Sequence, residues 1–174
     1  MKPWDSPRGR IILCVILLAG TIGIGWPLDR CNEQMRARYD NKAFPQLQNA
    51  DSADEARGIV ATWDGIPGAN DEIRKTMLVD LVFALFYAPL AALLAYWVSL
   101  RRKTPWVAEF GRWAAIAALA GGAADLVENG IMLQMLGDPN AAASLFPVMH
   151  VFTLIKGGGL TVALFYIVFA HIDW

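Results

Sequence analysis

Two carboxylates and an amide interrupt an apolar stretch in the second half of the chain, GGAADLVENGIML at residues 121–133. Asp125, Glu128 and Asn129 are spaced i, i+3 and i+4, so on a helix their side chains share one face. Ionisable groups in apolar surroundings bind protons or cations, or act as general acids and bases. The spacing therefore predicts one ionisable site on a single helix face.

Four further side chains that could join this site lie in two other apolar segments. Asp80 and Tyr87 are two helical turns apart and share a face, while His150 and Lys156 follow later in the chain. A charge at the centre of a membrane helix costs about 2.5–3.5 kcal/mol on insertion scales. We therefore expect these groups to face inward and to contact one another.

The predicted pairing leaves a surplus of acid. Lys156 is the natural cation for Asp125 or Glu128, whereas Asp80 is expected to contact His150, the tyrosine or water. One lysine cannot neutralise three carboxylates, so at least one acid should be protonated, hydrated or matched by a cation from outside the chain. This imbalance is the main functional indication in the sequence.

The elements that position these residues are predicted to be membrane helices. The chain has 174 residues, of which 56% are hydrophobic and 18% are charged. A bilayer core of ~30 Å requires about 20 apolar residues in a helix. Segments of this kind lie at about 9–28, 77–100, 112–136 and 146–171. We predict an all-α fold, a four-helix bundle that forms a single four-span membrane domain over residues 1–174.

The basic residues predict the orientation of these spans. Lys2, Arg8 and Arg10 precede the first span, and residues 101–103 (RRK) with Arg112 follow the second. By the positive-inside rule both termini are cytoplasmic, and segments 29–76 and 137–145 are extracytoplasmic. We therefore expect a multi-pass membrane protein, with its ionisable groups at the membrane centre or in the outer half.

The larger extracytoplasmic segment has a helix signal of its own. Ser52 and Glu55 fit a capping box, and Ala56, Ile59, Val60 and Trp63 then recur at helical spacing. The pattern predicts a short amphipathic helix at about 52–63.

Composition also excludes some classes of function. A net charge of −1 without a basic run gives a nucleic-acid partner no electrostatic support. With two histidines and no metal-ligand motif, we expect no metal site and no cofactor, although haem ligation by His150 stays open. The expected partners are membrane lipid and a small amphipathic ligand. Glycine faces at Gly20 and Gly23, and in the third span, could also mediate oligomerisation.

Three interpretations of the polar cluster remain open. It is a structural core that fixes helix register, or a binding or transport site for a proton, a cation or an amphipathic ligand. Alternatively it belongs to an integral-membrane, lipid-modifying enzyme with Glu128 or Asp125 as general acid or base, His150 as its partner and Lys156 as a stabilising charge. No recognised catalytic signature supports the third interpretation, so enzyme status stays uncertain.

Residues 53–165 resemble an uncharacterised group of small bacterial four-span membrane proteins. The likeness rests on an outer helix that ends in Trp63, on the second-span pair Asp80 and Tyr87, on ADLVEN at residues 124–129, and on Lys156. It implies a four-helix fold in the bacterial inner membrane and a role for Asp80, Asp125, Glu128, Asn129 and Lys156, but no activity.

A fainter resemblance links DLVFALFYAPLAALLAYWV, residues 80–98, to the sterol-isomerase and sigma-2 receptor superfamily. In that superfamily an acid on a helix with aromatic residues and proline binds amphipathic cations. This chain departs from it in the third span and in carrying Lys156.

Overall fold

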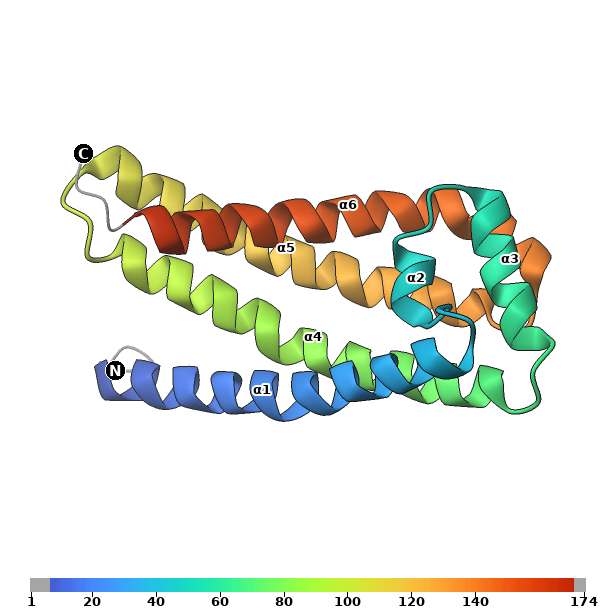
Figure 1. The fold of residues 1–174 in the computed structure, drawn as a ribbon. Coiled ribbons are helices and arrows are strands. Elements are labelled where there is room, and N and C mark those ends of the chain that lie inside the picture. The colour runs from blue at the N-terminus through green and yellow to red at the C-terminus, as the bar shows by residue number, and fades with distance from the viewer. Residues whose placement is uncertain (1–6, 171–174) are drawn as a thin grey trace. The chain divides into compact units, whose positions relative to one another are not determined.

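The computed structural model describes residues 7–170 and shows an all-α protein, as predicted (Figure 1). The helices are α1 (Pro7–Arg38), α2 (Phe44–Gln48), α3 (Ala53–Asp64), α4 (Ala69–Ser99), α5 (Pro105–Met135) and α6 (Pro139–Phe169). No strand occurs between residues 7 and 170. Two positions used in the predictions lie outside the described range: residue 171, the predicted end of the fourth span, and Lys2, one of the basic residues before the first span.

Four helices, α1, α4, α5 and α6, are long and apolar enough to cross a membrane, which confirms a multi-pass membrane protein. Each begins before its predicted span, and α1 also continues past residue 28 to Arg38. Hydropathy detects only the apolar part of a helix, whereas polar residues with good helix propensity extend it beyond the lipid.

The chain forms two compact units, and each of the four long helices contributes to both. Within the described range, the first unit comprises residues 7–23, 83–123 and 155–170, and the second comprises residues 24–82 and 124–154.

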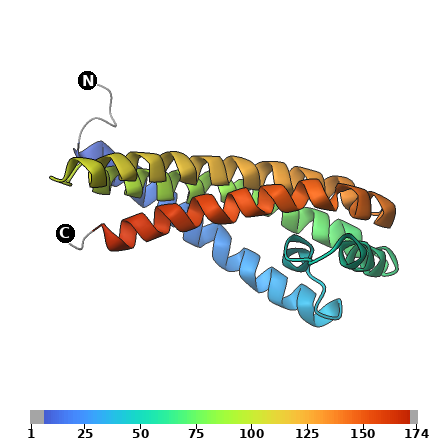
Figure 2. The same cartoon turned by 90° about the horizontal axis from the view of Figure 1, so that it is seen from above.

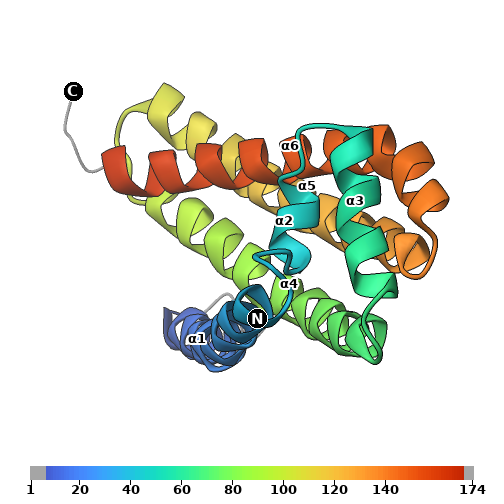
Figure 3. The same ribbon diagram turned by 45° about the vertical axis from the view of Figure 1, so that its right-hand side comes forward.

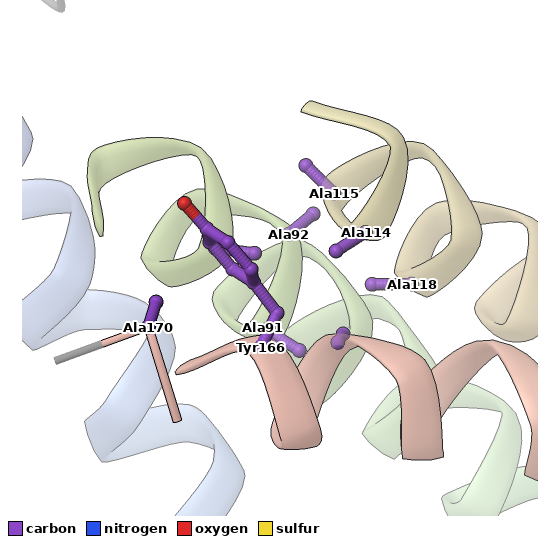
Figure 4. Close-up of a cluster of buried hydrophobic side chains, with 9 residues drawn as sticks. Ala91, Ala92, Ala114, Ala115, Ala118, Tyr166 and Ala170 are labelled. Carbon is purple, nitrogen blue, oxygen red and sulfur yellow. The ribbon is translucent and has the colours of Figure 1, made fainter. Parts of the chain in front are cut away.

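Small side chains build the core of the first unit. Its buried cluster consists almost wholly of alanines around one aromatic ring, that of Tyr166 (Figure 4). The members are Ala91, Ala92, Ala95, Ala114, Ala115, Ala118, Ala163, Tyr166 and Ala170. Between membrane helices small residues permit close backbone approach, and van der Waals contact then replaces the hydrophobic driving force of water. Gly111 also leaves room for this ring, since a Cβ there would overlap the Tyr166 side chain.

Helices α5 and α6 are in close contact at two glycines. A Cβ on Gly159 would overlap the carbonyl oxygen of Ala117, and a Cβ on Gly121 would lie 3.0 Å from the carbonyl oxygen of Lys156. The neighbouring Gly158 has open space around it. Gly159 therefore serves helix packing, whereas Gly158 does not.

We expect Gly159→Ala to destabilise the protein by about 1–3 kcal/mol, because the new methyl group meets a backbone carbonyl that cannot rotate away. Gly158→Ala, one residue earlier, should be neutral or slightly stabilising, since alanine has the higher helix propensity. Melting temperatures of both variants in detergent micelles provide the measurement. Equal melting temperatures would show that α5 and α6 are not in tight contact at this point.

The second unit contains the two short helices. Figure 2 shows the C-terminal end of α1 leading into α2 and α3, which lie side by side in Figure 3. The predicted amphipathic helix at 52–63 is confirmed by α3 and its buried face, which consists of Ala56, Ile59, Val60 and Trp63. Ser52 Oγ accepts a hydrogen bond from Glu55 N at 3.2 Å, as predicted. The Glu55 carboxylate, however, accepts from Asp51 N at 2.8 Å, one residue earlier than a capping box requires.

Tyr39 connects the end of α1 to the start of α4. Its hydroxyl donates a hydrogen bond to the Glu72 carboxylate, to which Arg38 Nη1 also donates at 2.7 Å. Burial, followed by the hydrogen bond to Glu72, raises the pKa of Tyr39 above its usual value.

Because the pKa of Tyr39 is higher in the folded state, its stabilising contribution is complete below the ordinary tyrosine pKa of about 10 and is lost as pH rises through the raised value. We expect Tyr39→Phe to cost about 1.5 kcal/mol at pH 8 and to remove this alkaline loss. Melting temperatures between about pH 8 and 12 compare the two proteins. An unchanged pH profile in the variant would assign the alkaline loss to another group.

Candidate functional site

The Asn129 side chain lies at the centre of the candidate site, in the second unit. Its Nδ2 donates to Asp80 Oδ2 at 2.8 Å, across from α5 to α4. The same nitrogen lies 3.1 Å from Asp125 Oδ1 and 3.1 Å from the Asp125 carbonyl oxygen. The exposed fractions of Asp80, Asp125 and Asn129 are 7%, 2% and 0%. Two carboxylates from different helices thus converge on one buried amide.

The helix period explains this convergence. On α5 the buried positions Asp125, Glu128 and Asn129 share one face, as their i, i+3, i+4 spacing predicted. On α4, Asp80 lies on the face that also buries Met77 and Ala84. Polar side chains at these positions are shielded from lipid and meet across the helix interface.

The orientation of the Asn129 amide leaves its oxygen without a donor. Nδ2 carries two hydrogens and lies close to three acceptors, whereas Oδ1 is buried and has no hydrogen-bond partner in the described part of the chain. Rotating the amide by half a turn would place Oδ1 against two carboxylates, so the observed orientation is the favourable one. The surroundings of Asn129 are therefore rich in oxygen acceptors.

Glu128 is held by the neighbouring helix. Thr153 Oγ1 on α6 donates to Glu128 Oε1 at 2.6 Å, and Glu128 is fully buried. Sequence reasoning missed Thr153, although it is a polar residue in an apolar helix, three positions after His150 and three before Lys156. Its i, i+3 spacing from both of these candidate residues was the signal that could have identified it.

We expect Thr153→Val to cost about 1.5–3 kcal/mol, because the buried Glu128 carboxylate loses a hydrogen bond while the shape of the side chain is kept. Thr161→Val, at an exposed position of the same helix, is the matched control. Glu128→Gln should be tolerated, since a glutamine oxygen still accepts from Thr153. Melting temperatures of the three variants test this order, and an equal loss from both valine variants would contradict it.

The remaining predicted site residues divide between the two units. His150 lies half-buried on α6 in the second unit, with its ring centroid 5.6 Å from that of Phe146. Its Nδ1 is buried and has no hydrogen-bond partner within residues 7–170. Tyr87 and Lys156 belong to the first unit, where Tyr87 packs on the Phe83 ring at 4.9 Å. Sequence reasoning did not predict the contact between Asp80 and Asn129.

Two buried methionines lie one helical turn from the acids on α4 and α5. Every methionine after Met1 is fully buried in the second unit: Met35, Met77, Met132, Met135 and Met149. Met77 lies one turn before Asp80 on α4, and Met132 lies one turn after Glu128 on α5. Thioether side chains are flexible and polarisable, so they adapt to irregular shapes. The polar cluster therefore borders a deformable apolar layer, which sequence reasoning had not identified.

Within residues 7–170, no group of three His, Cys, Asp or Glu side chains could hold a metal ion. The cluster instead offers carboxylate and amide oxygens that suit a proton, a monovalent cation or a protonated amine.

No family model matches the chain, and no curated protein or solved structure matches it either.

Proposed function

We propose that this multi-pass membrane protein binds a small cationic, hydrogen-bond-donating ligand at the cluster of Asp80, Asp125, Glu128 and Asn129. In the absence of ligand, the same cluster fixes the register of α4, α5 and α6. The observation that carries the proposal is the buried Asn129 Oδ1, which has no donor within residues 7–170 although the adjacent Nδ2 contacts two carboxylates.

The chemistry of the site selects the ligand class. A buried amide oxygen without a donor costs about 1–3 kcal/mol, and a ligand N–H group would recover that free energy. A positive charge on the ligand would also be attracted by the neighbouring carboxylates. The buried methionines supply an adaptable apolar lining for a short alkyl group. A small amphipathic amine satisfies all three features.

Two matched probes test the proposal on the protein purified in detergent. Hexylammonium carries N–H donors, whereas hexyltrimethylammonium has the same charge and none. We expect hexylammonium to raise the melting temperature, with a stabilisation of about 2.7 kcal/mol at 100 times its Kd, and the quaternary probe to have a much smaller effect.

The variants locate the effect. Asp80→Asn should abolish most of the shift with hexylammonium, whereas Asp71→Asn, at an exposed position on the same helix, should keep it. Equal shifts with both probes, or equal losses in both variants, would refute binding at this cluster. A purely structural core would show no shift with either probe.

We further propose that the protein lies in the bacterial inner membrane with both termini in the cytoplasm. The basic turn at residues 101–103 and the mixed charges of residues 29–76 support this orientation.

Cysteine labelling tests the orientation. In a background with Cys14→Ser and Cys31→Ser, Asp54→Cys should react with a membrane-impermeant maleimide in spheroplasts. Lys103→Cys should react only after lysis, because both positions are exposed and the proposed topology puts them on opposite sides of the membrane. The opposite labelling pattern would invert the topology.

A further inference from the structure

A groove in the first unit has the form of a lipid-chain site. It has a volume of about 560 Å³ and is formed by α1, α4 and α5. Ligand pockets in proteins span about 300–1,000 Å³ and are mostly apolar with a few placed polar groups. Here nearly all lining residues are apolar, and the exceptions are Tyr96 and Arg112.

The two polar residues lie at the same end of the groove. On α4 the lining runs from Pro89 to Tyr96, and on α5 it runs from Arg112 to Leu119, each with spacing i, i+3, i+4, i+7. A short turn between Ser99 and Pro105 joins the two helices, so they run in opposite directions. Tyr96, near the end of α4, therefore lies at the same level as Arg112, near the start of α5. The groove is therefore amphipathic along its length of about 10 Å, with a polar end near the turn and an apolar end away from it.

Neighbouring aromatic residues place the polar end at the level of the membrane interface. Trp106 and Trp113 on α5 are 63% and 59% exposed, and Trp97 on α4 lies under the Arg101 guanidinium at 5.2 Å. Exposed tryptophans gather where lipid headgroups begin. The apolar end of the groove then extends into the hydrocarbon of the same leaflet, whose depth is about 15 Å, half of the ~30 Å core.

The guanidinium of Arg112 is available to a ligand. Its only ion pair within residues 7–170 is with Glu109 at 3.4 Å, and both side chains are more than half exposed, at 58% and 57%. An exposed pair of this kind contributes little, whereas a guanidinium can bind a phosphate through two parallel hydrogen bonds.

We propose that this groove binds one acyl chain of an anionic phospholipid, with its phosphate on Arg112 and Tyr96. The occupant is a lipid of the leaflet on the side of the 101–103 turn, selected by charge at the polar end and by shape along Leu13, Leu17 and Ile116. This site is separate from the cluster proposed above and does not depend on it.

Native mass spectrometry of the detergent-purified protein tests the site with two added lipids, phosphatidylglycerol and phosphatidylcholine of identical acyl chains. We expect phosphatidylglycerol to bind at least about fivefold more tightly than phosphatidylcholine, because one basic residue close to an anionic headgroup increases the affinity by about this factor. Arg112→Gln should remove this preference. Ile116→Trp should weaken binding of both lipids, because the indole fills the groove from a position that is 55% exposed and so tolerates the larger side chain.

Lys103→Gln is the matched control, because it removes one exposed charge from the same end of the protein but not from the groove. Its preference for phosphatidylglycerol should match that of the original protein. An equal loss in the Lys103 and Arg112 variants would mean diffuse attraction and would overturn the proposal. Equal binding of the two lipids would also overturn it, as would an Ile116→Trp protein that binds both lipids as the original protein does. So would a dimer without bound lipid, because a second copy of the chain would then be the occupant of the groove.

Discussion

Replacement of Asn129 by leucine is expected to lower the free energy of unfolding by about 3–5 kcal/mol, the usual cost of removing one partner from a buried charged network. Leucine has a similar shape, but it removes the Nδ2 donor that Asp80 and Asp125 share. Each carboxylate then loses a hydrogen bond in a position that is at most 7% exposed. Melting temperatures in detergent, or fractions folded in a denaturant titration, provide the measurement.

Two further variants make this result specific. Asn140→Leu, at an exposed position in the first turn of α6, should change stability by no more than about 0.5 kcal/mol. Asp80→Asn in the Asn129→Leu background should restore part of the loss, because it removes one of the two buried charges. A loss below about 1 kcal/mol for Asn129→Leu, or no recovery in the double variant, would show that the amide does not hold the carboxylates together.

Periodicity predicted which residues of the site share a helix face, but it could not predict their partners across helices. Asp125, Glu128 and Asn129 are buried on one face because their spacing matches the turn of a helix. The contacts of Asn129 with Asp80, and of Thr153 with Glu128, depend on the rotation and the axial offset of neighbouring helices. Side-chain packing determines those two quantities, and no local pattern in the sequence encodes them.

Hydropathy predicted the all-α class and the four membrane-length helices, because about 20 apolar residues in succession are the length that a helix needs to cross a bilayer. Hydropathy did not predict the helix ends, since α1 remains helical through the polar residues as far as Arg38. It also did not reveal the close approach at Gly159. Glycines 157–159 look alike in the sequence, and only the direction each one faces distinguishes a contact from open space.

The second large effect is expected at Trp63, where replacement by alanine should cost about 3–5 kcal/mol. Trp63 is fully buried on the inner face of α3, and its Nε1 donates to the carbonyl oxygen of Lys42 at 2.5 Å. The substitution therefore leaves a cavity of indole size and a carbonyl without its donor. Because Lys42 precedes α2, the loss should also loosen the attachment of α3 to the segment before α2, which amide hydrogen exchange across residues 53–64 can measure.

Trp63→Phe separates the contributions of volume and hydrogen bonding, because phenylalanine keeps most of the ring contacts and lacks the N–H. We expect it to cost about 1–2 kcal/mol, less than alanine does. Trp113→Ala is the matched control, since Trp113 is 59% exposed and should change stability by about 0.5 kcal/mol or less. Faster exchange in α3 confined to the Trp63 variants would establish that this residue anchors the helix. Similar exchange in the alanine variants at 63 and 113 would instead mean that α3 is held by its other buried residues, Ala56, Ile59 and Val60.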